Sequence, residues 1–506
     1  EITRMYNTYY TNNLIQNGGF DEIGSEEVTN GDFSEIGNEE VENGNFSEIG
    51  NELITGFTNG VTYPFTTLTT SGNNITSAIV SSAFAGALSN PISSTSGTIY
   101  KVTFDYTKNS GNDLRVVFSD SISGAGGQIS NNVIISDSGT YTNYFTITSN
   151  NTGYLQIGTG SGGHSLNASI TNVSVKEVGQ DWSVYGNSTI SNGKANLNSG
   201  TGAFSNTLLQ SSVVTNLKSY KISFTISNYQ EGVAYVSIGF NTSFVVDADG
   251  DYTFYGISES GDNTNFIVRN GASNFIGSID NISVKEVGQH WTKETGWTIE
   301  NGKAVANTTG TQQIYQNVGL VNGKTYKISY SVSDFVSGAM YLSLNGNGFI
   351  SPPSTSDDNN VVHYVTYSGS DATIYFRGSP NVNASIDNIS VKEVGQGWTL
   401  LNGSSINTDL ATVVANGAIS STGNNWSLNQ SGVFSPLKNY KIQFRARQTS
   451  GSGNFNVGYA YGFILDEVIT SSFVDYSIDF TTSSDSWVNQ LTFGGYTIGD
   501  TFEVDN

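Results

Sequence analysis

Polar and apolar side chains alternate in four related stretches of the chain. In the clearest of them, Tyr220, Ile222 and Phe224 are separated by single residues with other side chains. A period of two is that of a β-strand with one buried face, so one side of each stretch is expected to lie in a core. The four stretches are Tyr100–Phe104, Tyr220–Phe224, Tyr326–Tyr330 and Tyr440–Phe444, and the side chains expected to be buried include Ile222, Phe224, Ile328 and Ile442.

A hexapeptide, Val-Lys-Glu-Val-Gly-Gln, occurs three times, and each copy is followed two residues later by a tryptophan. The asparagines that precede the copies, Asn172, Asn281 and Asn388, recur at a nearly constant interval. This interval suits a self-sufficient β-sandwich and is too long for a solenoid repeat. We therefore expect tandem modules that meet at these seams, with each tryptophan packed at the base of the next module. The copies are Val175–Gln180, Val284–Gln289 and Val391–Gln396, and the tryptophans are Trp182, Trp291 and Trp398.

A second, 13-residue repeat lies near the start of the chain at Asn17–Gly24, Asn30–Gly37 and Asn43–Gly50. Each copy contains an Asn-Gly turn signal, a phenylalanine and Glu-Ile-Gly, which predicts one short strand between two bends. Three apolar groups per copy cannot form a core. We therefore expect this stalk to be ordered only through contacts with another copy or another chain, in a trimeric or helical fibre.

The stalk is also acidic. Residues 17–55 hold 11 of the 43 acidic residues and no lysine or arginine. Two interpretations remain open: a solvated stalk whose charges repel one another, and a set of turns bridged by cations.

The predicted fold is therefore all-β: tandem β-sandwich (jelly-roll) modules preceded by a short β stalk of 13-residue repeats. The seams contain no proline or serine tract, so neighbouring modules should be stiffly coupled. The sequence continues past the last seam and stops at Val504-Asp505-Asn506, within the motif that precedes the other seams, so we expect residue 506 not to be a natural end. The expected segments are 1–16 (linker or tail of a preceding module), 17–52 (stalk), 53–180, 181–289, 290–396 and 397–506 (jelly rolls 1 to 4, the last truncated).

Composition excludes several classes of function. A net charge of −23 leaves too few cations to bind a phosphate backbone, so nucleic acid is not an expected partner. The absence of cysteine excludes disulfides and thiol chemistry. No apolar run of about 18 residues is present, so we expect no membrane insertion. Only 12% of the residues are charged, which is typical of secreted or virion-exterior β proteins that carry Asn, Ser, Thr and Gly on their surface.

Catalytic signals are missing as well. His164, His290 and His363 lie in different modules and show no metal-ligand spacing. The acidic cluster Asp247–Asp251 begins like an EF-hand loop, but Tyr252 stands where that loop needs glycine. We interpret the cluster as a turn between strands, and we expect that the chain is not an enzyme.

The order Gly-Trp, Asn-Gly-Lys-Ala, Tyr-Lys-Ile-Ser-Phe and Ile-Asp-Asn-Ile-Ser-Val resembles the galactose-binding-like jelly rolls of the carbohydrate-binding-module type. The phrases Val-Thr-Asn-Gly-Asp-Phe-Ser-Glu-Ile-Gly and Ile-Asp-Asn-Ile-Ser-Val-Lys-Glu-Val resemble those of bacteriophage tail-fibre and virion appendage proteins. The first seven residues, which alone have a helical pattern, resemble the closing turn of laminin-G/concanavalin-like lectin modules.

The resemblance implies candidate sites. Jelly rolls of this family often carry a structural calcium held by an aspartate of the last strand, a position that corresponds to Asp280, Asp387 and Asp505. Thr171 stands there in the first module, and the alternative is that these aspartates accept hydrogen bonds from nearby backbone N–H groups. For sugar stacking the candidates are Trp426 and Trp487, with a structural role as the alternative.

The resemblance also implies a function. We expect a structural or adhesive fibre segment on the exterior of a virus, with a bacteriophage as the favoured case, that spaces or presents a receptor-binding region. Its expected partners are other copies of itself, virion proteins or cell-surface glycans. The alternative is a secreted or cell-surface bacterial adhesin or polysaccharide-binding protein built from the same modules.

Overall fold

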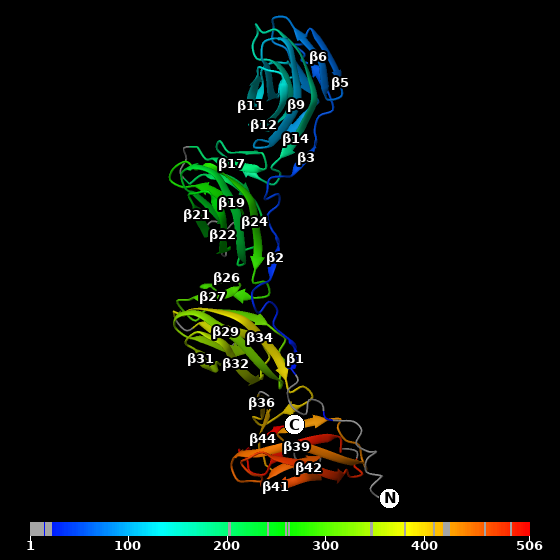
Figure 1. Cartoon of the computed structure of the whole chain (residues 1–506), viewed down its shortest axis with the longest axis vertical. Helices are drawn as coiled ribbons and strands as arrows, with labels where there is room; N and C mark the ends of the chain where they lie inside the picture. Colours follow the sequence, from blue (N-terminus) through cyan, green and yellow to red (C-terminus); the bar gives the residue numbers. More distant parts are fainter. Residues whose placement is uncertain are drawn as a thin grey trace. The chain divides into compact units, whose positions relative to one another are not determined.

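The structure of the chain is a computed structural model that describes Ile15 and residues 23–200, 204–239, 242–258, 261, 264–344, 348–378, 381–407, 410–417, 426–459, 462–485 and 488–505. All regular structure in these residues is β-strand (Figure 1). Their sheets form tandem antiparallel β-sandwiches, so the predicted all-β jelly-roll fold is confirmed. No helix suited to crossing a membrane occurs in this described part. The helical pattern of residues 1–7 lies outside it.

The chain divides into two compact units, residues 36–287 and residues 1–35 with 288–506. The first unit contains module 1 (strands β4 to β14) and module 2 (β15 to β24), and the second contains module 3 (β25 to β34) and module 4 (β35 to β44). Each module is a sandwich of two antiparallel sheets.

Module 1 has one sheet in the order β12-β9-β14-β6-β5 and another in the order β11-β10-β13-β7-β4, with β8 beside β13. Its strands are β4 (Phe57–Asn59), β5 (Thr67–Ser71), β6 (Asn74–Val80), β7 (Gly86–Ser89), β8 (Ile92–Ser94), β9 (Ile99–Gly111), β10 (Leu114–Ser119), β11 (Gln128–Ile135), β12 (Gly139–Thr146), β13 (Asn151–Thr159) and β14 (Leu166–Val178).

Module 2 has the sheets β16-β17-β24-β19-β22 and β15-β18-β23-β20-β21. Its strands are β15 (Ser183–Val184), β16 (Thr189–Ser191), β17 (Lys194–Asn198), β18 (Asn206–Gln210), β19 (Ser219–Glu231), β20 (Ala234–Ile238), β21 (Thr242–Val246), β22 (Gly250–Ile257), β23 (Phe266–Asn270) and β24 (Ile276–Val287).

Module 3 repeats this order in the sheets β26-β27-β34-β29-β32 and β25-β28-β33-β30-β31. Its strands are β25 (Thr292–Lys293), β26 (Trp297–Glu300), β27 (Lys303–Asn307), β28 (Gln313–Asn317), β29 (Thr325–Ser337), β30 (Met340–Leu344), β31 (Ile350–Ser354), β32 (Asp358–Thr366), β33 (Thr373–Gly378) and β34 (Asn383–Val394).

Module 4 has the same order again, in the sheets β36-β37-β44-β39-β42 and β35-β38-β43-β40-β41. Its strands are β35 (Thr399–Leu400), β36 (Ser405–Asn407), β37 (Leu410–Val414), β38 (Leu428–Ser431), β39 (Asn439–Ser450), β40 (Phe455–Tyr459), β41 (Gly462–Glu467), β42 (Val474–Thr481), β43 (Gln490–Gly495) and β44 (Thr501–Asp505).

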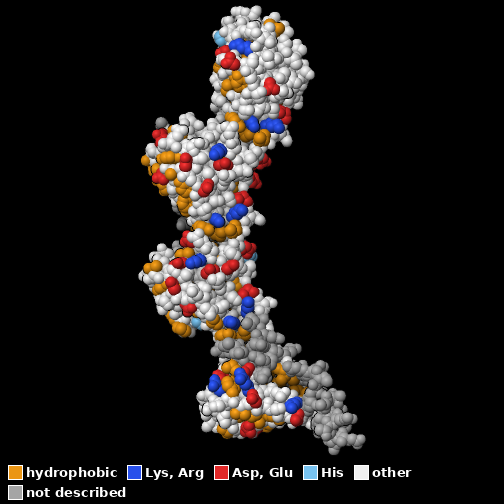
Figure 2. Space-filling view, in the orientation of Figure 1, with side chains coloured by type: hydrophobic (Ala, Val, Ile, Leu, Met, Phe, Trp, Pro, Cys, Tyr) orange, Lys and Arg blue, Asp and Glu red, His pale blue; other side chains and the backbone are white. Residues whose placement is uncertain are grey.

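The alternating stretches form the central strands β9, β19, β29 and β39. Ile222, Phe224, Ile328 and Ile442 are all buried, so the predicted register is confirmed. The closing strands β14, β24 and β34 include the first four residues of each hexapeptide and end before its glycine, and no described strand continues through a seam into the next module. The visible surface is mostly uncharged, with scattered charged side chains (Figure 2), as the low charged fraction requires.

The 13-residue repeats do not form a separate stalk. Their described strands, β1 (Ile23–Glu26), β2 (Ile36–Glu39) and β3 (Ile49–Glu52), pair antiparallel with β34, β24 and β14, respectively (Figure 1). The expectation that another copy or chain orders the repeats is therefore wrong for residues 23–52. A repeat cannot form a core alone, as predicted, but the missing burial comes from the modules of the same chain. The first repeat's residues 17–22 lie outside the described part.

The pairing is nested. Ile49 is paired with Val178, Ile36 with Val287 and Ile23 with Val394. Each segment enclosed by such a pair therefore begins and ends at neighbouring residues. Residues 36–287, which form the first compact unit, begin and end at one such pair.

Candidate functional site: the strap and the module edges

Residues 23–54, here called the strap, occupy a defined edge of each of three modules. In module 2 the closing strand β24 contains a bulge at Asn281, whose φ is 52°. Before the bulge, β24 pairs with β17, and after it the same side of β24 pairs with the strap strand β2. The segments after the bulge, here called acceptor edges, are Val173–Val178, Ile282–Val287 and Ile389–Val394, and the corresponding asparagines Asn172 and Asn388 have φ values of 53°.

A glutamate at the end of each strap strand clamps the acceptor edge. In module 2 the carboxylate of Glu39 accepts hydrogen bonds from the Val284 amide at 2.7 Å and the Ser283 hydroxyl at 2.6 Å. Equivalent bonds occur in the other two modules. Glu26 accepts from Val391 N (2.7 Å) and Ser390 Oγ (2.6 Å), and Glu52 accepts from Val175 N (2.8 Å) and Ser174 Oγ (2.5 Å).

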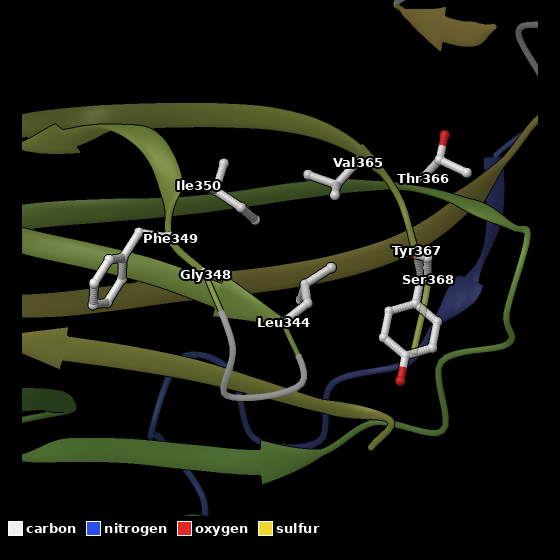
Figure 3. Close-up of a pocket in the computed structure, with 8 residues that line it drawn as sticks. All are labelled: Leu344, Gly348, Phe349, Ile350, Val365, Thr366, Tyr367 and Ser368. Atoms are coloured by element: carbon white, nitrogen blue, oxygen red, sulfur yellow. The ribbon is translucent and has the colours of Figure 1, made fainter. Parts of the chain in front are cut away.

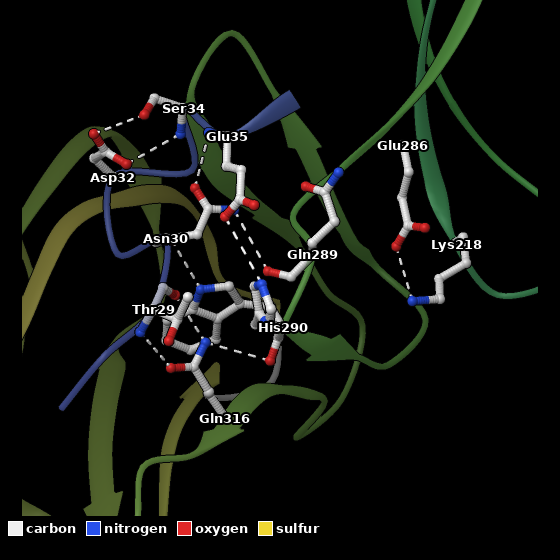
Figure 4. Close-up of polar contacts among 11 residues, drawn as sticks. Thr29, Asn30, Asp32, Ser34, Glu35, Lys218, Glu286, Gln289, His290 and Gln316 are labelled. Atoms are coloured by element: carbon white, nitrogen blue, oxygen red, sulfur yellow. Dashed lines mark hydrogen bonds and ion pairs between the residues drawn. The ribbon is translucent and has the colours of Figure 1, made fainter. Parts of the chain in front are cut away.

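The Asn-Gly turns at Asn30 and Asn43 are each held by a seam tryptophan. Asn30 adopts a φ of 52°, its side chain accepts the Glu35 amide at 3.0 Å, and its carbonyl accepts the indole N–H of Trp291 at 3.0 Å (Figure 4). Asn43 forms the same turn next to Trp182, whose indole N–H donates to the Asn43 carbonyl at 3.1 Å. Asparagine suits both positions because it tolerates a left-handed conformation better than most residues.

The glycine after each asparagine allows the two backbones to approach closely. The amide of Ile282 donates to the carbonyl of Gly44 at 2.9 Å, and a Cβ added to Gly44 would lie 2.0 Å from the Ile282 oxygen. Gly31 has the same distances to Ile389 in module 3. A side chain at either position would force the strap away from the edge.

Aromatic packing holds the strap to the seam. The rings of Phe46 and Trp182 lie 5.1 Å apart, and those of Phe33 and Trp291 lie 5.3 Å apart. All four side chains are buried, as is Trp398, whose ring lies 5.9 Å from that of Phe493. The prediction that the seam tryptophans pack at the base of the next module is confirmed.

A further apolar side chain recurs once in every repeat along the strap. Val41 belongs to the core of module 2 and Ile54 to that of module 1, while Val28 is buried beside Gly31 of its own repeat. One repeat length before Val28, Ile15 packs against the core of module 4. Successive apolar side chains of the strap, 13 residues apart, therefore pack against successive modules.

In modules 2 and 3, a buried glutamine forms two hydrogen bonds with the backbone of the strap. The side-chain amide of Gln316 accepts from Thr29 N at 2.8 Å and donates to Thr29 O at 2.9 Å (Figure 4). Gln210 forms the same pair of bonds with Glu42, at 3.0 and 2.8 Å. Because both bonds go to the backbone, this contact depends on the extended conformation of the repeat and little on its side chain.

Charge supports the pairing. Each clamp glutamate is in register with a lysine of the acceptor edge, and Lys392 Nζ lies 3.8 Å from Glu26. The charge of Glu40, in contrast, does not favour the pairing, because burial and the nearby carboxylates of Glu286 and Glu39 raise its pKa. Glu286 in turn pairs with Lys218 at 2.8 Å (Figure 4).

The aspartates proposed as calcium ligands have protein partners. The carboxylates of Asp280 and Asp387 accept the amide of the following asparagine at 2.7 and 2.6 Å, and Asp505 pairs with Arg445. No group of three or more Asp, Glu, His or Cys side chains suited to a metal occurs among the described residues. Asp280 and Asp387 thus form the backbone hydrogen bonds of the alternative, whereas Asp505 forms an ion pair instead, and calcium binding stays a prediction.

Two other predicted sites have different outcomes. Asp249 lies in the turn between β21 and β22 and accepts a hydrogen bond from Tyr229 N, and Asp251 follows in β22, where it accepts one from Thr225 Oγ1. The interpretation of this cluster as a turn between strands is therefore confirmed. Trp426 is half-buried, and its carbonyl accepts a bond from the Asn402 side chain. Trp487 lies outside the described residues, so the stacking role of the pair stays a prediction.

An aromatic row on the outer face of module 3 was not predicted from the sequence. Tyr315 and Tyr375 are cross-strand neighbours with rings 5.2 Å apart. Two residues along, Arg377 is in register with Gln313 and Tyr341, and its guanidinium donates to Gln313 at 2.6 Å. The period of two in these strands could have placed the five side chains on one face, but their pairing connects distant parts of the sequence.

Module 2 has a related row. Tyr235 is in register with Arg269, and the Arg269 guanidinium donates to the side chain of Asn206 at 3.3 Å. The exposed ring of Phe204 lies 6.0 Å from that of Tyr235. Each of the two modules thus presents a tyrosine, an arginine and a side-chain amide on its equivalent sheet.

A small cavity of about 200 Å³ opens between β30, β31 and β32 of module 3 (Figure 3). Its lining is as polar as it is apolar and includes Leu344, Ile350 and Thr366. Ligand pockets are usually larger, about 300 to 1,000 Å³. We therefore do not assign this cavity a ligand.

Comparisons with known proteins give remote similarities only. No family model matches the sequence, and no curated protein matches it. Among solved structures, the tandem CBM22 domains of Xyn10C from Paenibacillus barcinonensis are 12% identical, with 43% of this chain and 92% of that chain covered and a TM-score of 0.18. A triple jelly-roll protein of an archaeal virus turret is 13% identical (63% and 86% covered, TM-score 0.18). A Paenibacillus xanthan lyase is 10% identical (91% and 51% covered, TM-score 0.19). At such scores these similarities carry no conclusion about function, and the fold of each module is defined by its own sheets.

Proposed function

We propose that this chain is a non-enzymatic spacer segment of an extracellular fibre or appendage. The observation that carries the proposal is the match between the 13-residue strap repeats and the modules, since each of three acceptor edges receives one repeat with the same clamp. Backbone pairing of one continuous strap with three modules would oppose bending of the chain.

The seams within each compact unit support this role. Val178 and Ile99 of module 1 share a hydrophobic cluster with Trp182 and Ile190 of module 2. Val394 of module 3 likewise belongs to the core cluster of module 4. A shared core and an added strap both oppose rotation of one module against the next.

The proposed location is the exterior of a virus, with a bacteriophage as the favoured case, where the segment spaces or presents a receptor-binding region. The sequence resemblance to tail-fibre and appendage proteins supports this location, as does a surface that relies on uncharged polar residues. The proposed partners are virion proteins and further copies of the chain.

Electron microscopy of the full chain tests the spacer role. Individual molecules should show a narrow distribution of angles between adjacent modules. Freely jointed modules would contradict it. Proteomic analysis of purified particles tests the location, because a chain absent from every virion of its source would contradict a virion role.

Glycan binding by a secreted or cell-surface protein is the second candidate, and the aromatic row of module 3 favours it. Tyrosine rings beside an arginine offer a flat apolar surface with hydrogen-bond donors at its rim. Glycan-array binding that is lost in Tyr375→Ala and retained in Tyr185→Ala, which changes an exposed tyrosine outside the row, would support this function. An array without any bound glycan would contradict it.

A further inference from the structure

Two 13-residue segments of the strap, residues 23–35 and 36–48, bind modules 3 and 2, respectively, through the same contacts. Glu39 and Glu26 each accept a valine amide at 2.7 Å and a serine hydroxyl at 2.6 Å. Gly44 and Gly31 each accept an isoleucine amide at 2.9 Å. These contacts do not distinguish one module from the other.

The remaining contacts are equally general. The glutamine amides of modules 2 and 3 bind backbone groups of the strap, and the seam tryptophans pack against a phenylalanine that every repeat contains. Each segment places its clamp glutamate in register with a lysine of the acceptor edge, and each edge also carries a glutamate next to that lysine. The favourable charge contact is therefore local to the clamp pair. An acceptor edge thus has the properties of a binding site for one short extended peptide.

We propose that the acceptor edges of modules 2 and 3 are peptide-binding sites for these 13-residue segments, and that the same segment of a second copy of this chain can occupy them. Binding by strand addition uses main-chain hydrogen bonds for affinity and a few side-chain pockets for specificity. The clamp serine, the glutamine and the seam tryptophan supply those pockets. This inference concerns assembly and does not depend on the spacer role.

In the intact chain the site is filled from the same molecule. A tethered repeat has an effective concentration of about a millimolar, which excludes a free competitor of modest affinity. Exchange between copies therefore requires that one repeat first leaves its edge. Identical elements exchanged in this way link copies reciprocally or in an open series.

The test removes the strap segment from the acceptor edge of module 2 in the full chain. Residues 36–48 are replaced by a glycine and serine segment of equal length, which leaves the edge of module 2 empty. The probe is a fluorescent synthetic peptide with the sequence of residues 36–48. We expect one peptide to bind per variant chain, and binding to the unmodified chain to be at least about tenfold weaker.

Altered peptides test whether these contacts hold the peptide. Peptides with Glu39→Gln or Gly44→Ala should bind about tenfold more weakly, whereas Glu48→Gln, which changes an exposed side chain, should bind normally. Equal binding to the unmodified chain, or no binding to a folded variant, would overturn the proposal. If the replacement prevents folding, the milder double variant Glu39→Ala, Gly44→Ala takes its place.

A second copy is tested by complementation. The variant with the vacant edge is mixed with one that has an intact repeat and a weakened edge, Gln210→Ala with Ser283→Ala. Mass photometry should show particles of twice the 54.0 kDa chain mass in the mixture and fewer in either variant alone. A mixture that stays monomeric while the free peptide binds would overturn the exchange between copies.

Discussion

Replacing Gly44 with alanine tests the contact between strap and acceptor edge most sharply. The added Cβ would lie 2.0 Å from the Ile282 oxygen, whereas such contacts are essentially never shorter than 3.0 Å. The strap must therefore move by about 1 Å, which lengthens the 2.9 Å hydrogen bond from the Ile282 amide. The backbone of Gly44 is not in the left-handed region, so alanine adds no conformational strain of its own.

Two opposing effects set the magnitude. Alanine stiffens the unfolded chain, which favours the folded state by about 0.4 to 1 kcal/mol. Overpacking against a backbone oxygen costs about 1 to 3 kcal/mol. The net effect should be a local destabilisation of about 1 to 2 kcal/mol, which corresponds to an equilibrium constant for opening of the edge that is about 5- to 30-fold larger.

Hydrogen–deuterium exchange followed by mass spectrometry measures this opening. The peptide that contains the Ile282 amide should exchange faster in Gly44→Ala, and Gly31→Ala should have the same effect on Ile389. Gly163→Ala is the control, because nothing lies within 4 Å of a Cβ at that exposed position. Unchanged exchange at Ile282 would refute the close approach of the strap.

Three further predictions test the clamp, a half-buried histidine and the nesting. Glu39→Gln should speed exchange along the same edge, since a neutral amide accepts weaker hydrogen bonds than a carboxylate, and the exposed Glu48→Gln should not; equal exchange in the two variants would contradict the clamp. Burial lowers the pKa of His363, so the unfolded state binds more protons than the folded state below about pH 6.5. The free energy of unfolding of module 3, measured with urea, should therefore fall between pH 7.5 and pH 5. This fall should be absent in His363→Gln. Removing residues 36–48 and 179–287 together, which takes out one repeat and one module, should give a cooperatively folded protein, whereas removing 36–48 alone should lower the melting temperature; the opposite order would contradict the nesting.

The alternation of apolar residues was sufficient to predict the strands and their buried faces. Ile328 sits in a stretch whose period of two leaves only one face for the core, so no long-range information was needed. The tryptophans after the seams were also predictable, because a large apolar residue at a fixed place in each repeat has few positions to occupy other than a core.

The partner of the strap could not be predicted in the same way. Counting apolar groups correctly showed that a repeat cannot fold alone, but the count does not say which surface supplies the burial. Nothing local to Glu39 indicates that its carboxylate binds Ser283 and Val284, which lie in a distant part of the sequence. The match between the number of repeats and the number of seams was the available signal. The aspartates before each bulge were ambiguous for a similar reason, since a turn and a metal site both favour aspartate.

The register of the strap is the central claim, and cross-linking measures it directly. The chain has no cysteine, so Ile36→Cys with Val287→Cys introduces the only thiols, at residues that are paired in the structure. A short bismaleimide should link them within one chain in high yield, while the mismatched pair Ile49→Cys with Val287→Cys should remain unlinked. Efficient linking of the mismatched pair, or links formed only between chains, would contradict the one-repeat, one-module pairing.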